Sequence, residues 1–118
     1  EIKIEMERKI MNMKLKTMQD WFTEFARNKG WMDKGGTEDI NFLCEEAGEV
    51  AREVRRHESG RHAHAENEIM TKEEMRVKLA EEIGDVLQVL SVIASRYDIT
   101  LEEAFEIHKE KVVKAYGK

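Results

Sequence analysis

The sequence predicts an all-α fold with a four-helix-bundle-like core that oligomerisation completes. Three observations favour it. The 118 residues contain no proline and are rich in strong helix formers. Apolar residues recur at helical spacing in four successive segments, and no stretch alternates in the manner of a β-strand. Capping residues and glycines separate these segments, so the links between helices are short. Helices of this kind bury their apolar stripes against one another.

The first predicted helix begins its clear apolar stripe at Met11 and ends before Gly30, which is a plausible C-terminal stop. The stripe consists of Met11, Leu15, Met18, Phe22 and Phe25. Residues 1–10 are charged and weakly patterned, so we interpret them as a frayed helix start or a cloning remnant. Trp21 adjoins the stripe, which favours a place in the core over a base-stacking role. Residues 31–36 are predicted to form a loop.

Each of the three later helices has a capping signal at its start. Thr37 is the predicted N-cap of the second helix, and Thr71 with Glu74 and Thr100 with Glu103 match the capping box. The apolar stripes that follow are Ile40, Leu43, Ala47, Val50 and Val54; Met75, Leu79, Ile83, Val86, Leu90, Ile93 and Tyr97; and Leu101, Ala104, Phe105, His108, Val112 and Ala115. The third helix is apolar nearly all round over residues 86–94, which predicts burial on several sides or a subunit interface.

Length and composition predict one all-α domain over residues 1–118. The formal net charge of −5 argues against general nucleic-acid binding. No apolar run approaches the roughly 20 residues of a membrane span, so no membrane partner is expected. Cys44 is the single cysteine, which excludes an intrachain disulfide and favours a cytoplasmic location. We expect Cys44 to be a small buried residue and no nucleophile.

The sequence carries two near copies of one acidic motif. The first runs over residues 45–50 as Glu-Glu-Ala-Gly-Glu-Val and the second over residues 81–86 as Glu-Glu-Ile-Gly-Asp-Val. On helical wheels Glu46 and Glu49 stand at the same two offsets from their apolar stripe as Glu82 and Asp85 do from theirs. If the two helices pack antiparallel, these carboxylate pairs can face each other.

Clustered carboxylates repel one another and need compensation. Mg²⁺ and Mn²⁺ prefer oxygen ligands and keep positions open for phosphate and water. A lone Glu-x-x-Glu on a helix usually lies on a solvated surface, and from the pattern alone both interpretations stay open. Gly48 and Gly84 share one wheel position in mid-helix, where glycine costs about 1 kcal/mol relative to alanine, and this predicts a close approach to the backbone there.

The Glu-Glu-x-x-Glu of residues 45–49, followed by Glu-x-x-Asp at residues 82–85, resembles the signature of the MazG-type nucleotide pyrophosphohydrolases. These belong to the all-α NTP pyrophosphatase superfamily, with dimeric dUTPases and phosphoribosyl-ATP pyrophosphohydrolases. The resemblance covers roughly residues 18–118. It implies a Mg²⁺-dependent hydrolysis of nucleoside triphosphates to the monophosphate and pyrophosphate, and a homodimer or homotetramer. By position it implies that the metal ligands are Glu46, Glu49, Glu82 and Asp85 and that the catalytic base is Glu45. Glu81 has no settled role.

Candidate substrate contacts are Lys109, Lys111, Lys114 and Trp31. The family often carries Lys and Arg in the last helix, but this segment has no Arg, and Val112 stands where many relatives have Asn. Lysines near a helix C-terminus also complement the helix dipole, so both interpretations stay open. Trp31 lies in a glycine-bounded loop, where it is a candidate to stack on a base.

Three functional alternatives remain from the sequence. Two lie in the same superfamily: a dUTP- or dCTP-specific enzyme and a phosphoribosyl-ATP pyrophosphohydrolase. The third is a non-catalytic helical interaction module, whose acids face solvent and whose apolar third helix binds a partner. A soft-metal site at His57, His62 and His64 is disfavoured because no cysteine accompanies them.

Overall fold

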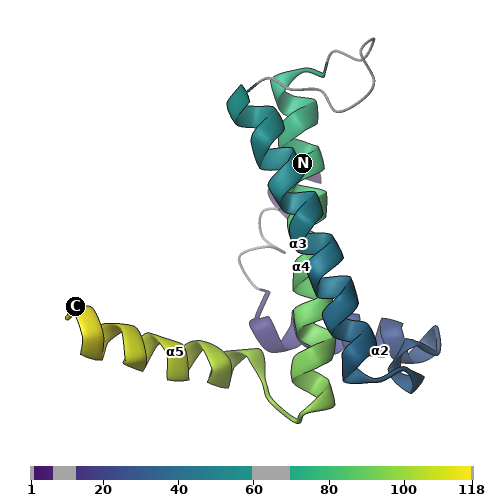
Figure 1. The fold of residues 1–118 in the computed structure, drawn as a ribbon, viewed down its shortest axis with the longest axis vertical. Helices are drawn as coiled ribbons and strands as arrows, with labels where there is room; N and C mark the ends of the chain where they lie inside the picture. The colour runs from purple at the N-terminus through teal and green to yellow at the C-terminus, as the bar shows by residue number, and fades with distance from the viewer. Residues whose placement is uncertain (1, 7–12, 60–69, 118) are drawn as a thin grey trace. The chain divides into compact units, whose positions relative to one another are not determined.

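The computed structural model describes residues 2–6, 13–59 and 70–117, and in these residues it contains helices and no strand (Figure 1). Residues 2–6 are helical, and the longer elements follow in the order α2 (Leu15–Asn28), η1 (Trp31–Asp33), α3 (Gly36–Ser59), α4 (Lys72–Arg96) and α5 (Leu101–Tyr116). The all-α prediction is therefore confirmed. The four-helix-bundle core and its completion by oligomerisation stay predictions. Met11, His62 and His64 lie outside the described residues.

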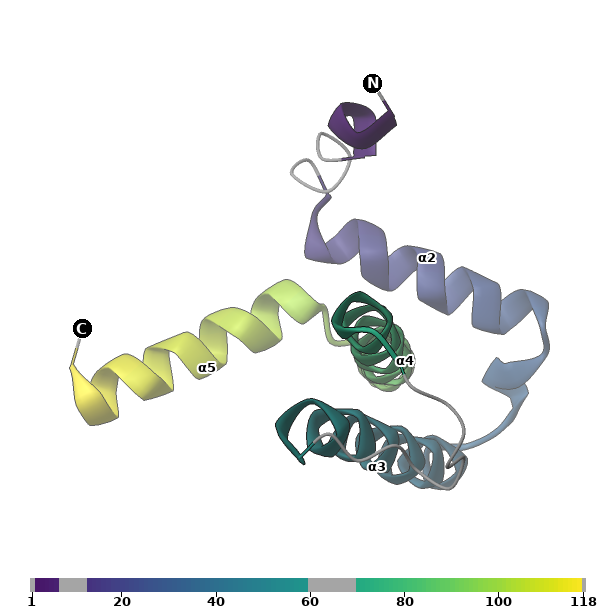
Figure 2. The same ribbon diagram turned by 90° about the horizontal axis from the view of Figure 1, so that it is seen from above.

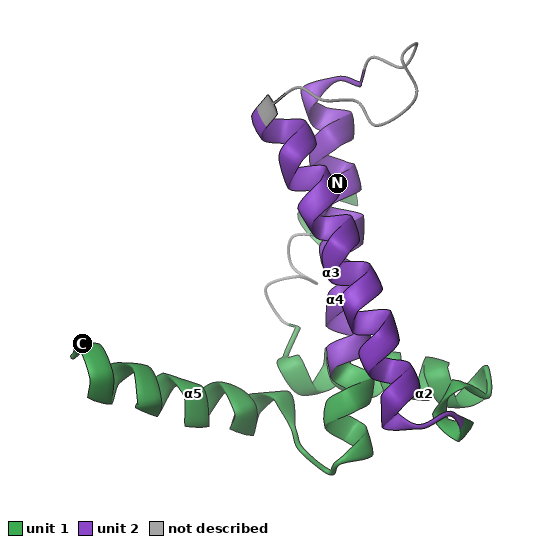
Figure 3. Ribbon diagram, in the orientation of Figure 1, with its two compact units in different colours: residues 1–33, 91–118 green, residues 34–90 purple. Residues whose placement is uncertain are grey.

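The chain forms two compact units (Figure 3). Unit 1 consists of residues 1–33 and 91–118, and unit 2 of residues 34–90. Unit 2 contains α3 and the first part of α4, whereas unit 1 contains α2, η1, the end of α4, and α5. A single domain over residues 1–118 stays a prediction. None of the described helices combines the length and the apolar character that crossing a membrane requires.

The helix boundaries follow the capping chemistry. The Thr71 hydroxyl accepts a hydrogen bond from the Glu74 backbone N–H at 3.0 Å, and the Glu74 carboxylate accepts one from the Thr71 N–H at 2.8 Å. Thr100 and Glu103 form the same reciprocal pair at the start of α5. Both capping boxes are confirmed. α3 begins at Gly36, one residue before its predicted N-cap. Gly30, just beyond α2, has a φ of 79°, which suits a residue without a side chain.

In unit 2, α3 lies antiparallel beside the first part of α4 (Figures 1 and 2). The face that α3 turns to α4 contains several charged side chains. Along it Glu46, Glu49 and Arg56 are half-buried, and Glu53 is completely buried. The expected core stripe is only partly buried in this unit: 52% of Ile40, 41% of Val54 and 45% of Ile83 are accessible, whereas Leu43 and Val50 are half-buried. The two helices are antiparallel, the arrangement in which the sequence predicted that the acids can face each other.

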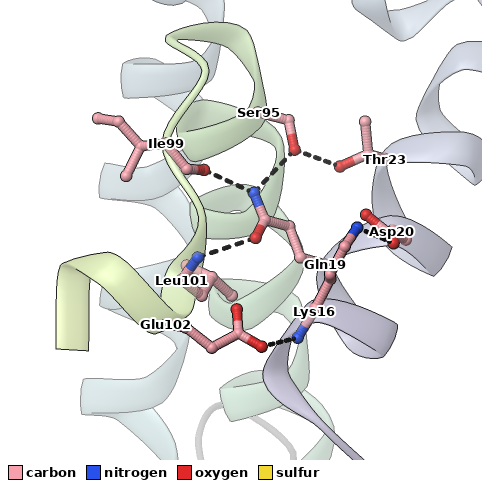
Figure 4. Close-up of polar contacts among 8 residues, drawn as sticks. All are labelled: Lys16, Gln19, Asp20, Thr23, Ser95, Ile99, Leu101 and Glu102. Carbon is pink, nitrogen blue, oxygen red and sulfur yellow. Dashed lines mark hydrogen bonds and ion pairs between the residues drawn. The ribbon is translucent and has the colours of Figure 1, made fainter. Parts of the chain in front are cut away.

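In unit 1, Gln19 of α2 binds the turn between α4 and α5 (Figure 4). Its Nε2 donates to the Ser95 Oγ at 3.0 Å and to the Ile99 carbonyl at 2.8 Å. Its Oε1 accepts from the Leu101 backbone N–H at 2.9 Å. Thr23 completes the network with a 2.8 Å hydroxyl contact to Ser95. One buried amide therefore satisfies backbone groups on both sides of the turn, which fixes where α5 begins.

The buried apolar side chains of unit 1 are small. They are Ala26, Val92 and Ala94, which allow α2 and the end of α4 to approach closely. Trp21 is 62% exposed, so its predicted place in the core is wrong. Its ring stacks on Phe25 at 5.4 Å between centroids. Beyond residue 102, every described residue of α5 is exposed.

We expect Gln19→Ala to lower the free energy of unfolding by about 1–3 kcal/mol, because it leaves the Leu101 N–H and the Ile99 carbonyl without their partner. Urea unfolding followed by circular dichroism measures the change. Asp20→Asn is the control on the same helix. It removes only the exposed Lys16–Asp20 pair, so a change below about 1 kcal/mol is expected. Equal losses in the two variants would contradict the role given to Gln19.

Candidate metal centre

Three carboxyl groups of unit 2 converge between α3 and α4. Glu46 comes from α3, and Glu82 and Asp85 come from α4. One oxygen of each lies within 4.8 Å of the others. Residues three apart on a helix project on one side, so Glu82 and Asp85 approach Glu46 together. These three residues are called the acidic cluster below.

The charges in the acidic cluster oppose one another. Burial raises the pKa of Glu46 above its ordinary value, and the charge of Asp85 and a hydrogen bond with it raise it further. Burial also raises the pKa of Glu82, with further increases from Asp85 and Glu49 and an opposing effect from Lys78. Two unit charges 4.8 Å apart repel by about 1 kcal/mol in bulk water and by about 3 kcal/mol at an effective dielectric constant of about 20. The cluster therefore favours a proton or a cation.

The donor set fits a hard divalent cation. All three groups offer carboxylate oxygens, which Mg²⁺, Mn²⁺ and Ca²⁺ prefer. The Glu46 Oε2 is buried and has no hydrogen-bond partner, so a cation would satisfy an acceptor that the described residues leave unsatisfied. Asp85 is exposed, which leaves one side of the cluster open to solvent.

Glu49, the fourth predicted ligand, is paired with an arginine. Its Oε2 accepts a short hydrogen bond from the Arg52 guanidinium, three residues further along α3. Glu49 is nevertheless close enough to Glu82 to raise the pKa of that carboxyl group. The structure thus brings three of the four predicted ligands together and places the fourth beside them, bound to Arg52.

Sequence reasoning missed the buried ion pair that Glu53 and Arg56 form on α3. Glu53 is completely buried, and its two oxygens lie 3.2 and 3.1 Å from the Arg56 Nη1. The signal was present in the spacing. Glu53 is seven residues after Glu46, which puts both on one face, and the pattern Glu-x-x-Arg repeats at residues 49–52 and 53–56.

Comparison with known proteins identifies the chain's relatives. The MazG nucleotide pyrophosphohydrolase domain matches residues 37–116, which is more than half of the sequence. The chain belongs to the MazG nucleotide pyrophosphohydrolase family. It is 38% identical to the uncharacterized protein YvdC of Bacillus subtilis (strain 168), over 88% of this chain and 97% of that protein. It is also 38% identical to the uncharacterized protein YpjD of the same strain, over 80% and 83% of the two chains. No solved structure matches it.

Glu45 and Glu81, the first acids of the two motif copies, are both exposed in this MazG-family chain. The charge of Glu45 contributes to the raised pKa of Glu46, so Glu45 lies at the edge of the acidic cluster. Glu81 is not among the groups that shift the pKa of Glu46 or Glu82. The two positions match in sequence but differ in their electrostatic contact with the cluster.

Two smaller expectations for α3 and α4 are wrong. A Cβ placed on Gly48 or Gly84 meets no atom of the described residues within 4 Å, so no backbone or side chain of this part of the protein approaches them closely. Cys44 is exposed rather than buried. The glycine pair therefore leaves open space beside each acidic motif.

The predicted substrate contacts lie in unit 1, whereas the acidic cluster lies in unit 2. Lys109, Lys111 and Lys114 are exposed on α5, and the Lys109 Nζ lies 5.9 Å above the centre of the Phe105 ring. Trp31 begins η1, is 43% exposed and meets Phe25 edge-on at 5.7 Å between centroids. Their contact with substrate stays a prediction.

The raised pKa values predict that, in the cation-free protein, Glu46 and Glu82 contribute less to folded-state stability as the pH rises. The folded state holds protons on Glu46 and Glu82 above their ordinary pKa of 4.5. Their ionisation therefore costs folded-state stability as the pH rises from 4.5 through the raised values. We expect the wild type to lose stability relative to Glu46→Gln over this window. Urea unfolding in a chelator at pH 4.5–8 measures the difference, and a relative gain by the wild type would contradict it.

Proposed function

We propose that this MazG-family chain is a Mg²⁺-dependent nucleoside triphosphate pyrophosphohydrolase, which converts a (d)NTP and water into the (d)NMP and pyrophosphate. Family membership supports hydrolysis of a nucleotide anhydride. The observation that carries the proposal is the convergence of Glu46, Glu82 and Asp85 around an unsatisfied buried oxygen. The divalent cation that accompanies a nucleoside triphosphate would supply the positive charge that this cluster lacks.

The residues proposed to hold the cation are Glu46, Glu49, Glu82 and Asp85. When bound, the cation neutralises charge on the phosphate oxygens and orients them for in-line attack. Mn²⁺ is a possible substitute, because it accepts the same oxygen ligands. For Glu49 to contribute, its carboxylate exchanges the Arg52 guanidinium for the cation. The four acids come from two helices, whose rigid backbones fix their spacing.

Glu45 is the proposed general base. It is exposed and next to Glu46 in the chain, and its charge acts on Glu46. An exposed carboxylate can receive the proton of a water molecule as that water attacks the α-phosphorus. The new P–O bond forms to the water oxygen, the bridging bond to the β-phosphate breaks, and pyrophosphate leaves. The products are the nucleoside monophosphate, pyrophosphate and a proton held by Glu45.

Several substrate classes share the proposed cleavage chemistry. A dUTP- or dCTP-specific enzyme and a phosphoribosyl-ATP pyrophosphohydrolase use the same cleavage. A panel of (d)NTPs and phosphoribosyl-ATP, assayed for pyrophosphate release, separates these alternatives. A helical interaction module without catalysis would release pyrophosphate from none of them and would show no thermal shift with Mg²⁺. The proposed substrate contacts are Trp31, Lys109, Lys111 and Lys114. The proposed source of the substrate is the cytoplasmic nucleotide pool.

We expect Glu45→Gln to lower kcat by about 10²–10⁴-fold, since it removes a general base without changing the size of the side chain. Asp85→Asn should abolish the Mg²⁺-dependent rise in Tm as well as pyrophosphate release, because it removes a ligand charge. Glu81→Gln is the matched control, at the equivalent position of the second motif copy, and it should retain activity. Full activity in Glu45→Gln or Asp85→Asn would show that these roles are wrongly assigned.

A homodimer or homotetramer is the proposed assembly. In unit 1, α5 leaves 55% of Phe105, 67% of Ile107 and 86% of Tyr116 exposed. In unit 2 part of the apolar stripe of α3 and α4 is also exposed, namely Ile40, Val54 and Ile83. Exposed apolar side chains in this number exceed the isolated ones that a monomer surface normally carries. A second copy of the chain would bury them.

We expect Phe105→Glu to shift the protein toward smaller species, because it places a charge within the apolar surface of α5. Sedimentation velocity at micromolar concentration measures the distribution. Glu110→Gln, a charge-removing change on the same exposed helix, should leave the distribution unchanged. A wild type that sediments as a monomer at this concentration would contradict the proposed assembly.

A further inference from the structure

Arg52 occupies an unusual position beside the acidic cluster, between two carboxylates of its own helix. Its Nη2 donates to the Glu49 Oε2, and its Nε lies 3.6 Å from the Glu53 Oε2. The side chain is 41% exposed, whereas that of Arg56 is 14% exposed. Arg52 thus combines a charge held near the acids with access from solvent.

Glu53 does not depend on Arg52 for its neutralisation. Both of its oxygens lie within hydrogen-bonding distance of the Arg56 Nη1, at 3.2 and 3.1 Å. The 3.6 Å separation from Arg52 is beyond a hydrogen bond, and the Arg52 Nε is buried without a hydrogen-bond partner. Among the described residues, Glu49 is therefore the hydrogen-bond partner of the Arg52 guanidinium.

The chemistry of the site gives Arg52 a second possible partner. Glu49 is a proposed cation ligand, and a carboxylate that turns to a cation releases the guanidinium it held. A guanidinium presents a planar set of donors that matches phosphate oxygens. Arg52 lies one helical turn after Glu49 on α3, so a guanidinium released by Glu49 would remain near the proposed cation site.

We propose that Arg52 binds a phosphate group of the substrate. In the cation-free protein Glu49 keeps the Arg52 guanidinium hydrogen-bonded, and it releases the guanidinium when a cation binds the Glu49 carboxylate. The inference rests on the proposed function, because it concerns the same cation site. Arg52 thereby has two successive partners. In the cation-free protein it neutralises Glu49, and in the loaded protein it supplies positive charge to the phosphate chain.

The alternative is a purely structural Arg52, which only holds Glu49 in place. The two roles predict that removal of Arg52 weakens the binding of different ligands. A structural Arg52 acts through the cation site, so its removal would weaken the binding of Mn²⁺ itself. A phosphate-binding Arg52 opposes the cation by its charge, so its removal would leave Mn²⁺ affinity equal or higher and would weaken only the phosphate ligand.

The experiment uses calorimetric titration of the full chain with three probes: Mn²⁺ alone, tripolyphosphate at saturating Mg²⁺, and a triphosphate analogue with a methylene group between its α- and β-phosphorus atoms. Arg52→Gln should weaken tripolyphosphate and the analogue by the same factor, about tenfold or more, without weakening Mn²⁺. Arg76→Gln is the matched control. Arg76 forms the same type of pair with Glu73 on α4, and Glu73 is not a proposed cation ligand.

Arg52→Lys keeps the charge and the stem of the side chain but loses the planar fork, so a smaller loss for both phosphate probes is expected. If Arg52→Gln does not fold, Arg52→Lys provides the test of phosphate binding by Arg52. Unchanged tripolyphosphate affinity in the folded variants, or an equal loss of Mn²⁺ and tripolyphosphate affinity, would overturn the role of Arg52. If the wild type binds neither phosphate probe in the presence of Mg²⁺, the proposed function fails and the inference fails with it.

Discussion

Mutual repulsion of carboxylates between α3 and α4 is the constraint on which the rest of unit 2 depends. Glu46, Glu82 and Asp85 converge within 4.8 Å where two helices pack, a place that most proteins fill with apolar side chains. Each charge there is partly removed from water, which raises the pKa of Glu46 and Glu82. The cluster itself therefore favours a proton or a cation, whereas the acids of the next two turns of α3, Glu49 and Glu53, are paired with arginines of their own helix.

That compensation explains the order of charges along α3. After Glu49 the sequence continues Val-Ala-Arg-Glu-Val-Arg-Arg, so that Arg52 meets Glu49 and Arg56 meets the completely buried Glu53. A buried carboxylate without a partner is strongly destabilising, whereas a hydrogen-bonded pair is tolerated. The inner face of α3 consequently carries charged side chains from Glu46 to Arg56, with the half-buried Val50 among them. Apolar residues such as Ile40, Val54 and Ile83 are left on the outer surface. The proposed metal site and the proposed oligomer thus have one physical origin.

Local chemistry made much of the fold predictable. Thr71 and Thr100 identified two helix starts because a capping box depends only on residues three apart. The matched motifs also predicted that the acids of α3 and α4 would face each other. The wheel analysis failed where it assumed that the most apolar face of a helix is the buried one. It therefore misplaced Trp21, which is exposed, and it overlooked Glu53, whose burial depends on Arg56 rather than on its own hydrophobicity. The hydrophobicity of single residues does not reveal that a buried carboxylate has an arginine partner. The Glu-x-x-Arg spacing does indicate it.

The same electrostatics set the order in which ligands can bind. Under the proposed function, a triphosphate that approached the acidic cluster without a cation would be repelled by Glu45, Glu46 and Asp85. Arg52 is bound to Glu49, and Lys78 lowers the pKa of Glu82 without offsetting the increases from burial and the surrounding acids. The proposed function therefore requires that the cation arrive before the nucleotide or together with it. Under the proposed role of Arg52, the cation-free protein would bind a triphosphate weakly, because the Arg52 guanidinium stays paired with Glu49 until a cation binds that carboxylate.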